Sequence, residues 1–243
     1  MIPIGLVIPV IWNVLTSFLI SISFIFTAPY VGNAVYYTLN RALIPFGLHH
    51  VLASLVRFTE AGGTYMINGT EYVGILNATN EILFNLGPTS EYWKQLMPTL
   101  TSYLGGAQML TTLFRVPAIG LAMYHTSFLK NRKIAKGVIL TCCLTAFLGN
   151  ITEPLEFSFL FISPPLFILY CVMCGIGAIP YQMLNICIGY IRGTIFDFGI
   201  FGLLYEDRPC DPGNHQLCSF LFRFQVVYCK IQSGDAGTGS VRD

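Results

Sequence analysis

Two long stretches of the chain contain no charged residue, and this feature limits the possible folds more than any other. Residues 1–40 and residues 157–190 include no Asp, Glu, Lys or Arg. A helix that crosses a bilayer needs about 20 consecutive apolar residues, and apolar stretches of that length are typical of transmembrane segments. We therefore expect an all-α integral membrane protein with several spanning helices, the first of them over residues 6–26.

The composition of the whole chain supports this expectation. Of the 243 residues, 54% are hydrophobic and only 10% are charged, and the mean hydropathy is +0.64, whereas a soluble domain has about 25% charged residues. The net charge of +1 gives no reason to expect nucleic acid as a partner. Five of the eight cysteines lie in apolar stretches without a zinc-binding spacing, so we predict no metal ion and no other cofactor; these cysteines are Cys142, Cys143, Cys171, Cys174 and Cys187.

Two carboxylates interrupt the apolar sequence at residues 149–157 (GNITEPLEF). An ionised side chain at the bilayer centre costs at least about 2.5–3.5 kcal/mol, and such groups usually mark the path of a substrate or ion. Pro154 favours the first position of a helix, which places Glu153 at or near the N-cap and Glu156 at the third position, where a carboxylate caps backbone N–H groups. We therefore expect Glu156 to be structural and Glu153 to face a ligand; the alternative for Glu153 is a simple helix cap.

A second polar interruption lies in residues 34–58, where helix-breaking and ionisable side chains occur together: Arg41, Pro45, Gly47, His49 and His50. Irregular backbone at membrane depth is tolerated only where it is buried in protein or lines a cavity. We therefore predict that this segment forms part of a site. The structural alternatives are that the two imidazoles bond backbone carbonyls freed by the proline, and that the arginine snorkels to the membrane interface.

Two polar segments indicate the orientation of the chain. Residues 59–98 contain four glutamates and one lysine, whereas residues 130–136 contain four cations. By the positive-inside rule, we expect the basic segment on the cytoplasmic side and residues 59–98 on the opposite side. Arg192 and Asp197, five positions apart in a largely apolar region, are expected to form a structural ion pair.

Three sequence blocks occur in the same order as in one known family. Residues 44–50 (IPFGLHH) are similar to a PFGLHH element, residues 117–125 to the segment before a basic loop, and residues 149–157 to a GITEPIEF motif. The chain therefore resembles the membrane-embedded IIC component of the bacterial phosphoenolpyruvate-dependent sugar phosphotransferase system, glucose superfamily. Residues 57–64 (RFTEAGGT) look most like the maltose/glucose branch.

The resemblance implies a homodimeric helical transporter with re-entrant hairpins in the bacterial inner membrane, a lipid bilayer that it crosses several times. It would bind a glucose- or maltose-type sugar, which a partner IIB domain phosphorylates. Residues 1–204 would be a partial IIC domain that matches the C-terminal part of the family's IIC domain, and residues 205–243 a divergent C-terminal tail without a IIB domain. Asn150 stands where the family usually has glycine; because asparagine tolerates positive φ, we expect the turn to be kept.

The resemblance also implies a sugar site made of Arg41, His49 and Glu153, with His50 and Thr152 as neighbours. A carboxylate accepts hydrogen bonds from two vicinal hydroxyls, an imidazole donates or accepts, and a guanidinium is a planar fork of donors. Glu153 or His49 would also accept the proton of the sugar hydroxyl during phosphoryl transfer, so these two are the catalytic candidates. Arg41 would offset the cost of keeping Glu153 ionised away from water.

Two other functions remain open from the sequence alone. The first is an ion-coupled secondary transporter with a carboxylate at the bilayer midplane, because broken helices build such sites as well. The second is a non-functional fragment of a permease. A soluble glycosidase is excluded, since two carboxylates three positions apart at a helix start do not flank a sugar ring.

Overall fold

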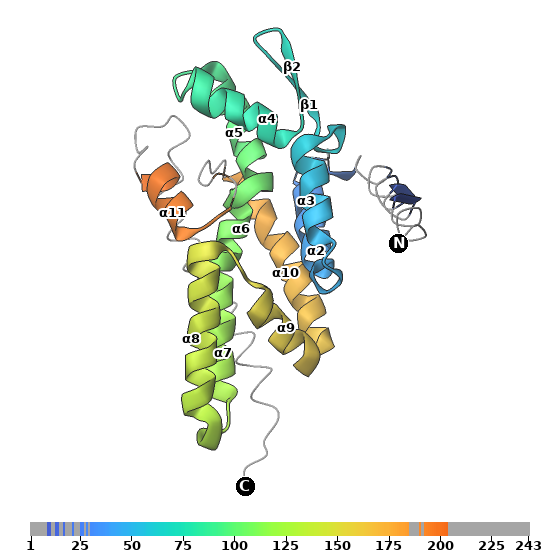
Figure 1. The fold of residues 1–243 in the computed structure, drawn as a ribbon. Helices are drawn as coiled ribbons and strands as arrows, with labels where there is room; N and C mark the ends of the chain where they lie inside the picture. The colour runs from blue at the N-terminus through green and yellow to red at the C-terminus, as the bar shows by residue number, and fades with distance from the viewer. Residues whose placement is uncertain are drawn as a thin grey trace.

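In the computed structural model of the chain, the described residues are 30–184, 190, 192–203 and the single positions 9, 10, 13, 14, 17, 21, 25, 26 and 28. The helix predicted over residues 6–26 falls for the most part outside them, and the predicted tail, residues 205–243, lies wholly outside. The described part is made mainly of helices, as the sequence predicts (Figure 1).

The segment that the sequence predicts to be broken folds as a helical hairpin. Helix α2 (Val31–Ala42) is followed by a single 3₁₀ turn (Ile44–Phe46) and then by α3 (His49–Phe58). Gly47, at φ 70°, supplies the left-handed residue between the turn and α3. The two helices lie side by side, and the Asn40 side chain donates a hydrogen bond to the backbone carbonyl of the first residue of α3 at 3.2 Å (Figure 1).

A second pair of helices begins at the motif with two carboxylates. Helix α8 (Arg132–Gly149) ends at Asn150, whose φ of 58° and ψ of 30° confirm the predicted left-handed turn. Helix α9 (Glu153–Ile162) then runs to Ser163, where the extended backbone separates it from α10 (Pro164–Met183). Helix α10 packs along α2 and is, within the described part of the chain, the helix long and apolar enough to cross a bilayer by itself.

Between these pairs runs one continuous helical rod in which α-helical and π-helical turns alternate. Its α-helical parts are α5 (Glu91–Thr101), α6 (Ala107–Leu110) and α7 (Val116–Thr126), and π-helical turns occupy Ser102–Gly106 and Thr111–Arg115. Such π-helical turns are frequent at functional sites. The remaining helical elements are the 3₁₀ turns Glu60–Gly62 and Leu129–Asn131, α4 (Ile75–Asn80), α11 (Ile195–Asp197) and the π-helical turns Glu81–Leu86 and Phe198–Leu203.

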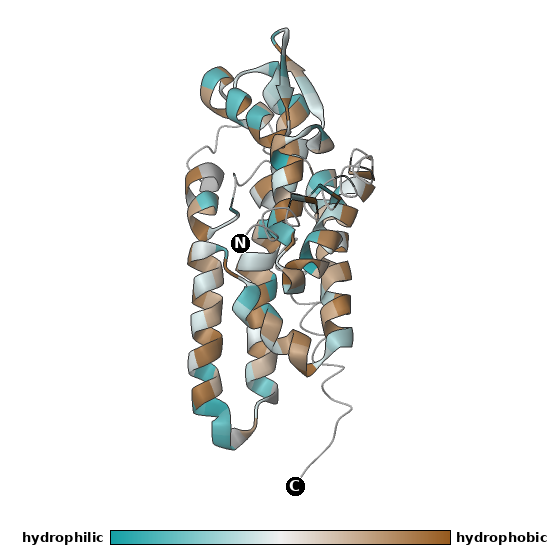
Figure 2. Ribbon diagram, turned by 45° about the vertical axis from the view of Figure 1, so that its right-hand side comes forward, coloured by the Kyte–Doolittle hydropathy of each residue, from teal (hydrophilic) through white to brown (hydrophobic). Residues whose placement is uncertain are grey.

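The two polar segments lie at opposite ends of the molecule. The basic turn between α7 and α8 forms one end, and the loop region that follows α3 forms the other (Figure 2). Between them α8 exposes a series of large apolar side chains, namely Ile134, Val138, Leu140, Leu144 and Leu148. The core consists of two buried clusters, one centred on α2–α6 and the other on α7–α10.

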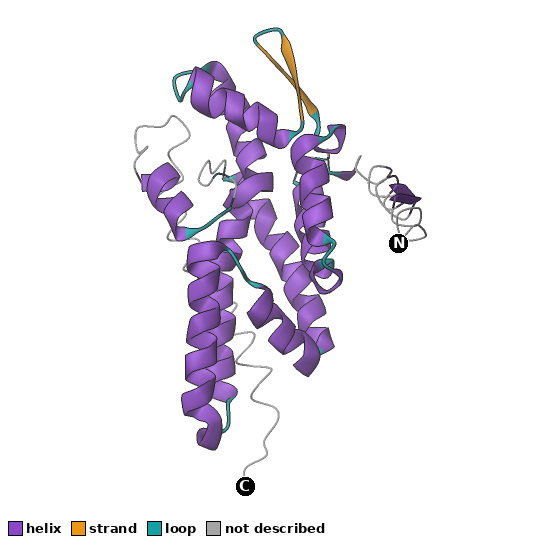
Figure 3. Cartoon of the chain, in the orientation of Figure 1, coloured by secondary structure: helices purple, strands orange, loops and turns teal. Residues whose placement is uncertain are grey.

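A β-hairpin corrects the prediction that the chain is entirely α-helical. Strands β1 (Thr64–Ile67) and β2 (Thr70–Val73) pair in antiparallel fashion at the end of the molecule away from the basic turn (Figure 3). The connection is Asn68-Gly69, with φ of 52° and 80°, as a two-residue type I′ turn requires. The strand residues are mostly β-branched or aromatic, which favours strand over helix in so short a segment.

Candidate functional site

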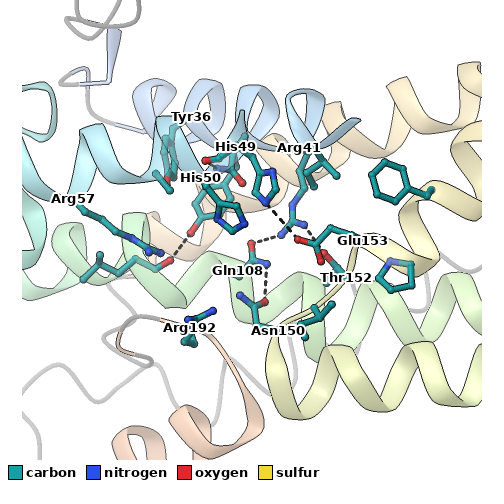
Figure 4. A pocket seen from close by; sticks show the side chains of 18 residues that line it. Tyr36, Arg41, His49, His50, Arg57, Gln108, Asn150, Thr152, Glu153 and Arg192 are labelled. Atoms are coloured by element: carbon teal, nitrogen blue, oxygen red, sulfur yellow. Dashed lines mark hydrogen bonds and ion pairs between the residues drawn. The ribbon is translucent and has the colours of Figure 1, made fainter. Parts of the chain in front are cut away.

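The structure brings all five predicted binding residues to one cavity of about 520 Å³ (Figure 4). The cavity lies where α2, α3, the helical rod and the α8–α9 connection meet, and its volume is within the range of about 300–1,000 Å³ typical of small-molecule sites. Its lining includes residues more than 100 positions apart in the chain. The predicted residues that line it are Arg41, His49, His50, Thr152 and Glu153.

His49 and Glu153 face each other across this cavity, each as the first residue of its helix, α3 or α9. His49 Nε2 lies 3.4 Å from Glu153 Oε1, and the two side chains are 14% and 29% exposed. In the described part of the chain, His49 Nδ1 and Glu153 Oε2 have no hydrogen-bond partner. Because buried polar atoms are nearly always hydrogen-bonded, these two atoms are suited to a ligand with hydroxyl groups.

Glu156 differs from the prediction, because it pairs with Arg41 instead of capping the helix. Arg41 Nη1 lies 2.8 Å from Glu156 Oε1, the side chains are 2% and 1% exposed, and the Tyr170 hydroxyl donates to the same oxygen at 2.5 Å. The physical reason is that α9 begins at Glu153, one residue earlier than predicted, so Glu156 lies a full turn inside the helix. Arg41 was predicted to offset the charge of Glu153. Its ion pair is instead with Glu156, and Arg41 acts on Glu153 only as a more distant charge.

Thr152 holds Arg41 in place. Arg41 Nη1 donates to Thr152 Oγ1 at 3.0 Å, and Arg41 Nη2 donates to the side-chain oxygen of Gln108. Gln108 in turn donates from Nε2 to Asn150 Oδ1 at 2.8 Å. Gln108 and the Asn150 side chain also line the cavity, and the sequence analysis missed both. The one available signal for Gln108 was an amide side chain within an apolar segment.

His50 packs against His49 at the solvent-exposed side of the cavity, with the ring centroids 4.0 Å apart. One ligand atom each of His49, His50 and Glu153 lies within 4.8 Å of the others, so among the described residues this group could hold a metal ion. Three ligands would leave a coordination position open. That the site works without a metal remains a prediction from the sequence.

Two further arginines line the cavity, and the sequence analysis did not assign either to the site: Arg57, in the last turn of α3, and Arg192 (Figure 4). Arg192 and Asp197 do interact, but through the backbone N–H of Arg192 and not through its guanidinium. Asp197 Oδ2 accepts hydrogen bonds from the backbone N–H groups of Arg192 at 3.0 Å and Gly193 at 2.7 Å. Asp197 therefore fixes the backbone of this turn instead of neutralising the guanidinium.

Comparisons with known proteins identify the family of the chain. The family model described as "Phosphotransferase system, EIIC" matches residues 1–175, which include the five predicted binding residues. The maltose-specific EIICB component of a PTS system from Escherichia coli (strain K12) is 35% identical over 203 residues. The match covers 83% of this chain and 37% of that relative, so the chain spans little more than a third of the relative's length.

Proposed function

Because the chain belongs to the phosphotransferase system EIIC family, we propose that it is the sugar-binding part of a permease component, with the sugar held in the cavity around His49 and Glu153. The chain is a membrane protein, as members of this family are. The name of the relative, a maltose-specific EIICB component, supports two finer terms of the proposal, a maltose-type sugar and a IIB domain as the partner. Glucose is the alternative sugar that the sequence resemblance implies.

The observation that supports this proposal most directly is the His49–Glu153 pair with its two free polar atoms. A sugar presents neighbouring hydroxyls that donate and accept, and the free Glu153 Oε2 accepts from one while His49 Nδ1 accepts from or donates to another. The separation of 3.4 Å leaves the carboxylate and the imidazole close enough to act on one hydroxyl together. The Arg41–Glu156 pair lies behind them and holds α2 to α9.

The same pair suits proton removal during phosphoryl transfer. When a sugar hydroxyl oxygen bonds to the phosphorus that the IIB domain delivers, the bond from phosphorus to IIB breaks and the hydroxyl proton must leave. A carboxylate or imidazole within hydrogen-bond reach accepts that proton, and Glu153 and His49 are the candidates. This chain would then contribute the sugar-binding half of a sugar phosphotransferase.

The membrane arrangement that we propose is a multi-pass domain over residues 1–204 in the bacterial inner membrane, as a homodimer. The α2–α3 pair, which is broken at Ile44 in the cavity lining, and the α9–α10 pair, whose first residue Glu153 lines the cavity, would be the re-entrant hairpins. The basic α7–α8 turn at one end and the acidic region at the other support opposite sides of the bilayer, with the basic turn cytoplasmic.

Equilibrium binding of labelled glucose and maltose to the detergent-purified full chain tests the proposal. Glu153→Gln removes a charged acceptor, so the affinity of the preferred sugar should fall about tenfold or more. Glu91→Gln is the matched control, because Glu91 is exposed on α5 and, among the described residues, its carboxylate accepts a hydrogen bond from the Gln95 side chain at 3.1 Å. The control should bind as the wild type does.

Two results would contradict the proposal. Equal sugar affinity in the wild type and the Glu153→Gln variant would remove Glu153 from the site, and a wild-type chain that binds neither sugar would support a non-functional fragment. In reconstituted vesicles, sugar uptake driven by an ion gradient without phosphoenolpyruvate and phosphocarrier proteins would favour the secondary transporter.

A further inference from the structure

Three side chains that line the cavity form a set of ligands for a metal ion: the imidazoles of His49 and His50 and the carboxylate of Glu153 (Figure 4). We propose that these residues bind a divalent transition-metal ion, with Zn²⁺ as the probe, and that the ion and the sugar exclude each other from the cavity. The exclusion rests on the proposed function, because it concerns side chains that the sugar would also contact. The metal site itself does not rest on it.

The separations of the ligand atoms suit a small ion. One ligand atom from each of the three residues lies within 4.8 Å of the other two, and His49 Nε2 is 3.4 Å from Glu153 Oε1. Zinc bonds nitrogen and oxygen at about 2.0–2.2 Å, which places two tetrahedral ligands about 3.3–3.6 Å apart. The His49–Glu153 pair already has this separation. The third ligand must approach by at most about 1.5 Å, and rotation of the exposed His50 side chain supplies such a shift.

The chemical types of the three ligands select the class of metal. Two imidazoles and one glutamate hold the catalytic zinc of several hydrolases and leave a fourth position for water or another ligand. Imidazole nitrogen suits zinc, copper and nickel, whereas Mg²⁺ and Ca²⁺ prefer sites made of oxygen alone. We therefore expect the group of His49, His50 and Glu153 to bind Zn²⁺ and to bind Mg²⁺ far more weakly.

The backbone that carries these ligands is held in place. The His49 carbonyl accepts a hydrogen bond from Asn40 Nδ2 at 3.2 Å, and the His50 carbonyl accepts one from Ser54 Oγ at 2.8 Å. Both imidazoles therefore start from the fixed first turn of α3, and Glu153 is the first residue of α9. Ligands carried by helices are positioned more precisely than ligands carried by loops.

The charges around the cavity limit the affinity. Arg57 and Arg192 also line the cavity, and their positive charges act against a cation. Glu153 is the anionic member of the proposed ligand set, whereas the tightest zinc sites have two or more thiolates. We therefore expect a dissociation constant for Zn²⁺ of about 1–10 μM near neutral pH, well above the values of four-ligand structural sites.

Isothermal titration of the detergent-purified full chain with ZnCl₂, in the absence of sugar, tests the metal site. The wild type should bind Zn²⁺ in the micromolar range and show no comparable binding of Mg²⁺. His50→Gln removes one of the three ligands. Loss of an outer hydrogen-bond partner of a ligand already costs about 10–100-fold in metal affinity, so loss of a ligand itself should cost about 100-fold or more.

Two control variants remove other groups that bind zinc. His125→Gln removes an imidazole that is exposed in the last turn of α7, and Cys142→Ser removes a half-buried thiol on α8. Both variants should bind Zn²⁺ as the wild type does.

Binding of labelled sugar in the presence of Zn²⁺ tests the exclusion. At a Zn²⁺ concentration ten times its dissociation constant, the apparent dissociation constant of the sugar should rise about elevenfold, and a chelator should restore it. In His50→Gln, the same Zn²⁺ concentration should change the sugar affinity of that variant by less than about twofold.

The possible failures are distinguishable. A wild type that binds sugar but no Zn²⁺, or a His50→Gln variant that binds Zn²⁺ as tightly as the wild type, would overturn the metal site and leave the proposed function intact. Sugar affinity that is unchanged by bound Zn²⁺ would overturn the exclusion. A wild type that binds Zn²⁺ through His50 but binds neither glucose nor maltose would sustain the metal site and overturn the proposed function.

Discussion

Glu153 and Glu156 stand three residues apart on one helix, yet they differ in burial and in the partners of their carboxylates. Glu156 is 1% exposed and binds the Arg41 guanidinium and the Tyr170 hydroxyl, whereas Glu153 is 29% exposed and lines the cavity beside His49. Residues at this spacing lie on similar faces of a helix. The two carboxylates therefore differ because Glu156 is more deeply buried in the protein than Glu153. The inner carboxylate joins two helices, and the outer one is left for a ligand.

Removing the inner carboxylate should have the largest effect on the molecule. Glu156→Gln leaves the buried Arg41 charge without its partner, and the loss of one member of a buried pair costs about 3–5 kcal/mol of folding free energy. We expect a large drop in the thermal unfolding midpoint of the purified chain. The matched variant Glu153→Gln, three positions away, should lower that midpoint little, because its carboxylate is partly exposed.

Equal loss of stability in these two variants would refute the division into an inner, structural carboxylate and an outer, ligand-facing one. A double variant, Arg41→Met with Glu156→Leu, sharpens the point. Replacing both members of a buried pair by apolar side chains is often neutral, so the double variant should regain much of the lost stability. It should not regain sugar affinity, because Arg41 also bonds Thr152 and Gln108 beside the cavity.

The close contact of α10 with α2 should be the next most sensitive feature. A Cβ atom at Gly175 would lie 2.5 Å from the backbone oxygen of Ala34 and 2.0 Å from Thr38 Oγ1. Gly175→Ala must therefore push α10 away from the helix that bears Arg41, and overpacking of this kind costs about 1–3 kcal/mol. The unfolding midpoint and the sugar affinity should both fall.

Gly137→Ala is the matched control for this substitution. Gly137 is exposed on α8 and a Cβ there meets nothing within 4 Å, so alanine should leave stability unchanged or raise it by up to about 1 kcal/mol. If Gly175→Ala were as harmless as Gly137→Ala, the contact between α2 and α10 would not be what positions the buried ion pair.

The same comparison explains how much of the site could be predicted from the sequence. Pro45 and Gly47 break a helix through their own backbone preferences, and Asn150 accepts the left-handed conformation for the same local reason. These features were predicted correctly because they depend on residues close in sequence. The carboxylate of Glu153 was likewise expected to face a cavity from the cost of placing it in an apolar segment.

The partners of the other polar residues could not be predicted, because they depend on distant segments. Arg41 and Glu156 are 115 positions apart, and only the packing of α2 against α9 and α10 shows that they meet. Local rules even gave the wrong role for Glu156, since a start of α9 displaced by one residue turns a capping position into an interior one. The β-hairpin was missed for a different reason, because its strands have only four residues each, too few for a clear alternating pattern.

Asn150 offers the test with the smallest expected effect, because replacing it by glycine changes the free energy of unfolding in opposite directions through the backbone and through the side chain. Asn150→Gly relieves the left-handed backbone, a gain of about 0.5–1 kcal/mol, and loses the hydrogen bond from Gln108, a cost of about 0.5–1.5 kcal/mol. The unfolding midpoint should therefore change little, whereas Asn150→Ala, which has the loss without the gain, should lower it clearly.

Gln108 connects Asn150 to Arg41 by hydrogen bonds. The sugar affinity of the Asn150→Gly variant therefore tests whether the Gln108–Asn150 pair contacts the ligand or only supports the Arg41–Glu156 pair. An Asn150→Gly variant with unchanged stability and weaker sugar binding would show that the Gln108–Asn150 pair contacts the ligand together with Glu153. Unchanged binding would assign the pair to the framework of Arg41 and Glu156.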